Sequence, residues 1–194
     1  MRLSEIDRGD TFGHRALIGL ISMVAGMRLP DAARVAFYHQ EFLAKTLGSW
    51  TQATMRAASQ WSISERELMA ALVAKWNTCP FCVGAHSAIA IKGMPRDVVD
   101  AALSDYRTAS LPAGLVATLG FLEKMTRTPA ELSADDARGV LDAGVSHEAL
   151  EDAIAVAAIF NIIARYANAL DFAIPTPAEF DKSAAMLLKR GYGS

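Results

Sequence analysis

Apolar residues recur every three or four positions through most of this chain, and no stretch alternates convincingly between apolar and polar residues. Such spacing puts apolar side chains on one face of a helix, whereas a half-buried strand needs a period of two. The sequence therefore predicts an all-α fold. The expected helices cover residues 14–27, 31–47, 50–60, 64–77, 80–92, 95–104, 112–127, 134–142, 147–170 and 177–190.

The 194 residues, 52% of them hydrophobic, are enough to bury a core without disulfides or metals. This composition excludes intrinsic disorder. The stretches near Pro129 and Pro175 are typical of turns rather than linkers. We therefore expect one all-helical domain over residues 1–194.

Charge is balanced, with 19 Lys and Arg against 21 Asp and Glu, and no basic patch that would bind nucleic acid is expected. The longest uncharged runs, 16–27 and 153–164, fall short of the roughly 18 to 20 residues needed to cross a bilayer. Acidic residues among the first ten offset the early arginines, which argues against a signal peptide. We expect a cytoplasmic protein with no membrane partner.

The two cysteines of the chain, Cys79 and Cys82, lie three residues apart, and His86 follows one helical turn later. If a helix begins at Cys79 and Pro80, then at about 100° per residue Cys82 lies about 60° and His86 about 20° to the same side of Cys79. The helix N-terminus favours a thiolate at Cys79, and His86 can exchange a proton with Cys82. This segment, within residues 64–93, has the parts of a thiol redox centre.

Glu67 has two competing interpretations. It can complete a capping box with Ser64, in which its carboxylate reaches back to the helix start. Alternatively, a tight turn after Trp76 folds the next helix back in an antiparallel hairpin and brings Glu67 to the cysteines. A second capping box, from Ser62 to Glu65, does not need Glu67.

Two plainer interpretations of the cysteines also stand. Free cysteines are often small buried hydrophobes. A zinc site is another alternative, with Cys79, Cys82 and His86 as ligands and Glu67 or His39 as the fourth, although structural zinc usually takes two separated ligand pairs.

The spacing Glu67-x11-Cys79-x-x-Cys82-x3-His86 resembles the alkylhydroperoxidase D-like branch of the carboxymuconolactone decarboxylase superfamily. A weaker resemblance extends over residues 60–172 and includes Asn161-x3-Arg165, similar to an Asn-x3-Arg helix in peroxidase-related members. The resemblance implies a helical bundle with a redox-active helical hairpin, assembled as a homo-oligomer. It also implies that peroxide attacks Cys82, that Cys79 resolves the product to a disulfide, and that His86 and Glu67 relay protons without a metal or cofactor.

The function that we expect is that of a thiol-dependent peroxidase or disulfide oxidoreductase, with a hydroperoxide as substrate and a thiol or dithiol as reductant. Phe81 stands where the best-known antioxidant members of the resembling family have a second His, which leaves the reductant and the rate open. The alternatives are a non-enzymatic, redox-responsive oligomer and a zinc-binding structural oligomer.

Overall fold

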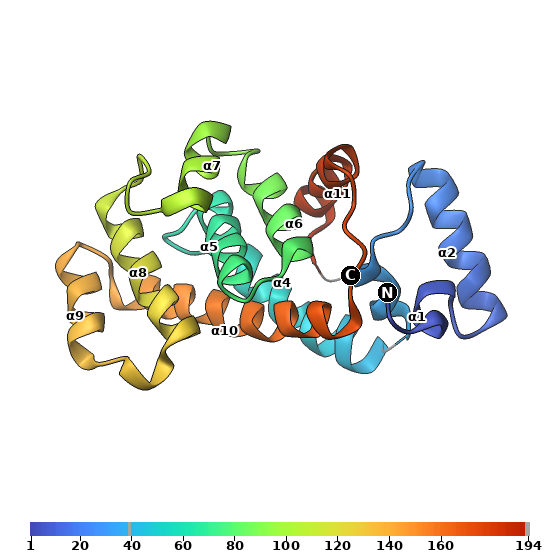
Figure 1. The fold of residues 1–194 in the computed structure, drawn as a ribbon, viewed down its shortest axis with the longest axis horizontal. Coiled ribbons are helices and arrows are strands. Elements are labelled where there is room, and N and C mark those ends of the chain that lie inside the picture. The colour runs from blue at the N-terminus through green and yellow to red at the C-terminus, as the bar shows by residue number, and fades with distance from the viewer. Residues whose placement is uncertain (39, 193–194) are drawn as a thin grey trace.

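The computed structural model describes residues 1–38 and 40–192, and in this part of the chain every regular element is a helix. The expected all-α fold is confirmed (Figure 1). The helices are α1 (Ser4–Arg8), α2 (Phe12–Ala25), α3 (Asp31–Tyr38), the π-helix η1 (Gln40–Leu47), α4 (Gly48–Arg56), α5 (Ile63–Trp76), α6 (Pro80–Ala90), α7 (Arg96–Asp105), α8 (Ala113–Arg127), the 3₁₀-helix η2 (Pro129–Glu131), α9 (Ala134–Asp142), α10 (His147–Leu170) and α11 (Pro177–Arg190).

Helix bounds follow the sequence pattern closely from α4 onward and less closely before it. The single helix expected over 31–47 is an α-helix to Tyr38 and a π-helix from Gln40. A π-helix bonds i to i+5, so a 3.6-residue period does not reveal it. Helix α1 was not expected, because five residues are too few to show a period.

The long helix α10 lies along one side of the molecule, and α4, α5 and α8 pack against it (Figure 1). Helices α5 and α6 form an antiparallel hairpin in the middle, which α11 covers on the α6 side. Residues 66–74 of α5 are all buried, so this helix is surrounded by protein. The main core joins Leu68 and Leu72 of α5 to Leu119 of α8 and Phe160 of α10.

Gly84 allows α6 and α11 to approach closely. A Cβ at this position would lie 2.4 Å from a ring carbon of Phe180 on α11, a distance that real Cβ atoms do not tolerate. The Phe180 ring therefore rests on the backbone of α6, one turn from the cysteines.

Helix α10 is long and apolar enough to cross a membrane by length and composition, a test that the core helix of a soluble protein also passes. Here Val156, Ile159 and Phe160 are at most 1% exposed and belong to the main core. The packing of α10 on α4, α5 and α8 thus buries part of this apolar stretch.

Candidate active site

The turn between α5 and α6 brings the sequence motif together. Thr78 adopts a left-handed conformation (φ 53°), its amide donates to the Lys75 carbonyl, and the Cys79 amide donates to the Ala74 carbonyl. These two bonds form a Schellman motif, the usual end of a helix that reverses direction. Thr78 occupies the position that normally requires glycine, so the chain is strained one residue before Cys79.

Asparagines of α10 hold this turn in place. The side-chain amide of Asn77 donates to the Val73 carbonyl and to Asn161 Oδ1, at 2.9 Å each. Asn168 Nδ2 donates to the Asn77 carbonyl at 2.9 Å. Asn161 thus has a structural role that its spacing did not indicate, whereas no described contact links Arg165 to the turn.

Cys79 caps the N-terminus of α6, Pro80 takes the first helical position, and Cys82 lies in the first turn, as predicted. Both cysteines are free thiols and only 1% exposed. A hydrogen bond from the Cys82 thiol, together with the backbone amides of Phe81 and Cys82, lowers the pKa of Cys79 to about 7. Donation to Cys79, burial and the nearby charge raise the pKa of Cys82. The pKa values of the two thiols therefore differ in opposite directions from that of an ordinary cysteine.

Glu67 and His86 face each other across the hairpin. His86 Nδ1 and Glu67 Oε2 are 2.6 Å apart, and the two residues are 6% and 0% exposed. The hairpin therefore brings Glu67 to the helix that carries the cysteines, as expected. The capping-box interpretation of Glu67 is wrong, because Ser62 and Glu65 form the capping box of α5.

Two further residues complete the environment of Glu67. Arg56 at the end of α4 places a guanidinium nitrogen 2.8 Å from Glu67 Oε1. The Tyr192 hydroxyl, beyond α11, lies 2.8 Å from Oε1 and 3.0 Å from Oε2. Burial raises the pKa of Glu67, but the hydrogen bond and charge of His86, the charge of Arg56 and the hydroxyl of Tyr192 outweigh it and lower the pKa. Glu67 is thus held as a carboxylate.

Neither Arg56 nor Tyr192 could be found from sequence spacing. Arg56 belongs to a different helix, and Tyr192 lies 125 residues from Glu67. Only the packing of α4 and the chain end around the hairpin shows that they belong to the site.

His86 is oriented by its Nδ1 atom. Within the described residues, its ring forms hydrogen bonds through Nδ1 alone, to Glu67 and Tyr192, and the Phe160 ring packs edge-on at 4.4 Å between centroids. When the ring is neutral and Nδ1–H donates to Glu67, Nε2 carries the lone pair that can accept a proton.

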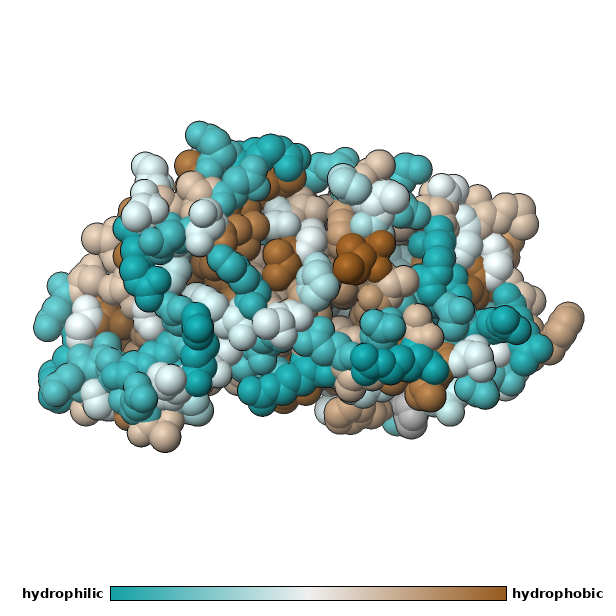
Figure 2. Space-filling view, in the orientation of Figure 1, coloured by the Kyte–Doolittle hydropathy of each residue, from teal (hydrophilic) through white to brown (hydrophobic). Residues whose placement is uncertain are grey.

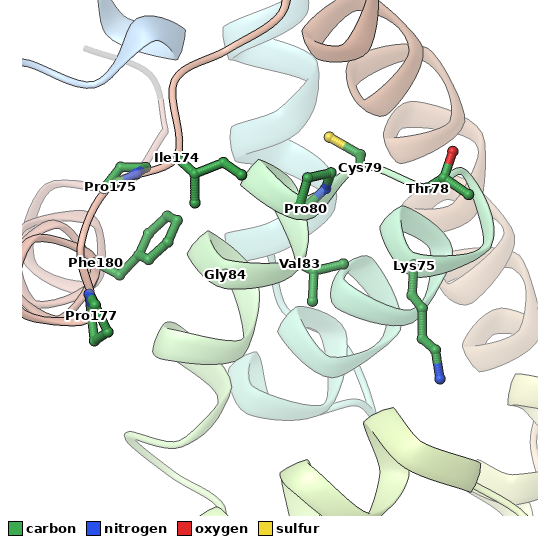
Figure 3. A pocket seen from close by; sticks show the side chains of 10 residues that line it. All are labelled: Lys75, Thr78, Cys79, Pro80, Val83, Gly84, Ile174, Pro175, Pro177 and Phe180. Atoms are coloured by element: carbon green, nitrogen blue, oxygen red, sulfur yellow. The ribbon is translucent and has the colours of Figure 1, made fainter.

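Cys79 opens onto a mainly apolar hollow of about 590 Å³ between α6 and the segment leading into α11. Figure 3 shows Cys79 and Pro80 on one side and Ile174, Pro175 and Phe180 on the other. Hydrophobic side chains show through in the middle of the molecular face that Figure 2 draws. The remaining lining residues are Lys75, Thr78, Val83, Gly84 and Pro177.

A second, more polar hollow of about 360 Å³ also reaches Cys79 and includes Arg2, Asn168 and Asp171 in its lining. Cys82 lines neither hollow. Of the two cysteines, both 1% exposed, Cys79 is the one that borders these two hollows.

The zinc alternative finds no support in the geometry. Among residues 1–38 and 40–192, no three His, Cys, Asp or Glu side chains gather closely enough to hold a metal ion. His39, considered as a fourth ligand, lies outside the described residues.

The fold of the chain is known from solved structures. No family model and no curated protein sequence matches the chain. Among solved structures, it resembles an uncharacterized peroxidase-related protein from Silicibacter sp. TM1040, with 25% identity, 93% of each chain covered and a TM-score of 0.76. An alkylhydroperoxidase AhpD core protein, peroxidase-related, from Ralstonia eutropha JMP134 has 24% identity, 88% coverage of each chain and a TM-score of 0.72.

The debrominase Bmp8 also shares the fold, with 20% identity, a TM-score of 0.70 and coverage of 91% of this chain and 94% of that one. The chain has the alkylhydroperoxidase D-like fold, as the motif implied. Because a debrominase has this fold too, the activity must be argued from the site.

Proposed function

We propose that the protein is a thiol-dependent peroxidase that reduces hydroperoxides through a dithiol/disulfide cycle of Cys79 and Cys82. The observation that carries this proposal is the buried Glu67–His86 pair, at 2.6 Å, on the hairpin that also bears both thiols. A dithiol next to an oriented base is what a two-electron reduction of an O–O bond requires. The peroxidase-related neighbours support the same class of chemistry.

The order in which the sulfurs act is the first part of the mechanism. The motif resemblance implies that peroxide attacks Cys82. The site instead favours Cys79, which borders both hollows and has a pKa of about 7. In our proposal the Cys79 thiolate attacks the terminal peroxide oxygen and the O–O bond breaks. The alkoxide leaves and takes a proton from solvent, and Cys79 becomes a sulfenic acid.

Disulfide formation is the step that needs a base. The hydrogen bond to the Cys79 thiolate and its charge no longer raise the pKa of Cys82 once Cys79 is a sulfenic acid, but burial still raises it, so the thiol needs a base. His86 accepts the Cys82 proton, and the Glu67 carboxylate stabilises the imidazolium. The Cys82 sulfur then attacks the Cys79 sulfur, an S–S bond replaces the S–O bond, and the released hydroxide takes the proton from His86 to form water.

The reductant restores the dithiol through the same sulfur. An external thiol gives its proton to His86 as its sulfur attacks Cys79 from a hollow, Cys82 leaves as a thiolate, and His86 passes that proton to Cys82. A second thiolate, or the second sulfur of a dithiol, then releases Cys79 as the reductant becomes a disulfide.

A turnover assay with an organic hydroperoxide and a dithiol tests the function, and single-cysteine variants test the order. We expect Cys82→Ser to form one sulfenic acid per chain at Cys79 with little turnover, and Cys79→Ser to react far more slowly. Faster oxidation of Cys79→Ser than of Cys82→Ser would reverse the order. Disulfide formation without multiple turnovers would favour the non-enzymatic alternative.

We also propose that the chain assembles as a homo-oligomer. Helix α2 exposes Phe12, Met23 and Val24 by 88%, 76% and 81%, and exposed apolar surface of this kind is typical of subunit interfaces. Light scattering at micromolar concentration tests the assembly, and a mass near the 20.8 kDa of one chain would contradict it.

A further inference from the structure

The end of the chain returns to the hairpin through a defined turn. Gly191 ends α11 with φ 75°, a conformation that favours glycine, and a Cβ there would lie 2.3 Å from Gln52 Oε1. The Tyr192 amide donates to the same Gln52 oxygen at 2.7 Å. Backbone geometry and one side chain of α4 thus set the position of Tyr192.

The Tyr192 ring lies between two members of the site. The Arg56 guanidinium carbon is 4.7 Å from the ring centroid, and the His86 ring is stacked at 6.1 Å with 29° between the planes. The Tyr192 hydroxyl reaches both carboxylate oxygens of Glu67 and lies 3.3 Å from His86 Nδ1. One side chain therefore contacts all three members of the Arg56–Glu67–His86 group.

We propose that Tyr192 is a positioning residue of the proton relay: it orients the Glu67 carboxylate so that Oε2 accepts from His86 Nδ1, and so leaves His86 Nε2 to receive the proton of Cys82. This inference rests on the proposed function of the relay. It adds to that function a residue from the far end of the chain.

The contacts of the Glu67 carboxylate explain why the Tyr192 hydroxyl matters. Glu67 Oε1 forms an ion pair with Arg56 and Oε2 accepts from His86, while a hydroxyl that donates between the two oxygens resists rotation of the carboxylate. Burial and the Glu67 charge raise the pKa of Tyr192, so the hydroxyl keeps its proton and remains a donor.

Donation by Tyr192 also favours the ionised form of Glu67. The groups that face this carboxylate are Arg56 from α4, His86 from α6 and Tyr192 after α11, with the charge of Arg66 nearby on α5. Helices α8 and α10 pack on α5 through apolar side chains such as Leu119 and Phe160. Loss of the Tyr192 donor should therefore raise the pKa of Glu67, with Arg56 and His86 still in place.

The experiment compares Tyr192→Phe with Tyr106→Phe. Phenylalanine keeps the ring between Arg56 and His86 and removes only the hydroxyl. Tyr106 is a matched control, since its hydroxyl also donates to a carboxylate, that of Glu123 at 2.8 Å, outside the cysteine site. Both variants lose a hydrogen bond from a tyrosine hydroxyl to a carboxylate, but only Tyr192→Phe loses it at Glu67.

The first readout is the titration of the Glu67 carboxyl carbon by NMR with labelled glutamate, assigned by its absence in Glu67→Gln. We expect a higher midpoint in Tyr192→Phe than in the parent, and no change in Tyr106→Phe. This readout does not depend on activity. An unchanged midpoint in Tyr192→Phe would overturn the proposal.

The second readout is peroxide turnover against pH. We expect kcat to fall about 10-fold in Tyr192→Phe, as is typical when a supporting hydrogen bond is lost, with the acid limb moved to higher pH. If Tyr192→Phe lowers the melting temperature as much as Tyr106→Phe does and leaves the pH profile unmoved, Tyr192 has only a structural role. If the parent itself shows no turnover, the proposed peroxidase function fails, and the NMR titration still decides whether Tyr192 controls Glu67.

Discussion

The α5–α6 hairpin and helix α2 place polar and apolar groups in opposite ways. The hairpin buries a carboxylate, an imidazole and two thiols, whereas α2 leaves Phe12, Met23 and Val24 in solvent. Both arrangements cost free energy in an isolated chain, since buried charges lose hydration and exposed apolar groups order water. The comparison suggests that the hairpin is built for chemistry and α2 for contact with another chain.

The largest effect should come from breaking the relay inside the hairpin. We expect Glu67→Gln to lower turnover by about 100-fold to 10,000-fold, because a neutral amide cannot stabilise the protonated His86. Glu65→Gln is the matched control on the same helix, since glutamine also fits a capping box. Steady-state peroxide assays with melting temperatures would check both, and a Glu67→Gln rate within a few-fold of the parent would remove Glu67 from the mechanism.

Part of the hairpin site could be predicted from the sequence. Two helical turns hold Cys79, Cys82 and His86, so the spacing of these residues predicted that they lie on one face of a helix. The position of Glu67 needed one further step, a hairpin favoured by the apolar face of α5. Two capping boxes competed for that region, and the sequence alone could not choose between Glu65 and Glu67.

Contacts between distant segments lay beyond such reasoning. Arg56 and Tyr192 reach Glu67 only because α4 and the end of α11 pack beside the hairpin. The asparagine bonds from α10 to Asn77 depend likewise on tertiary packing. Local periodicity carries no information on which helices become neighbours, and it reports the π-helix as an ordinary helix.

The two thiols should differ in reactivity. With a pKa of about 7, Cys79 should be half ionised near pH 7 and more reactive as the pH rises through this value, whereas the raised pKa of Cys82 keeps it protonated. We expect Cys79 to be alkylated by iodoacetamide at least about 10-fold faster than Cys82 at pH 7. Site-resolved mass spectrometry measures both rates, and faster labelling of Cys82 would contradict the proposed order.

The exposed apolar face of α2 can be tested by adding charge to it. Met23→Glu combined with Val24→Glu places charges on the exposed face of α2 and should dissociate the proposed homo-oligomer, because a buried unpaired charge is costly. Light scattering should show a smaller mass, while circular dichroism shows the same helix content. An unchanged mass would mean that this face of α2 is not an interface.

The smallest effect is expected at Thr78. Glycine adopts the left-handed conformation without strain, so Thr78→Gly should raise the free energy of unfolding by about 1 kcal/mol. Chemical denaturation measures this change. A loss of stability would show that the bond from the Thr78 hydroxyl to the Asn77 carbonyl, at 2.7 Å, outweighs the strain.

The central claim is that Cys79 and Cys82 cycle between dithiol and disulfide as they reduce a hydroperoxide. The most direct test is to add one equivalent of an organic hydroperoxide to the reduced protein, count free thiols and alcohol product, and then repeat with excess dithiol. We expect that two thiols are lost and one alcohol is formed per chain, with the bond mapped between Cys79 and Cys82, and that dithiol restores repeated turnover. Two persisting free thiols beside unreacted peroxide would contradict it.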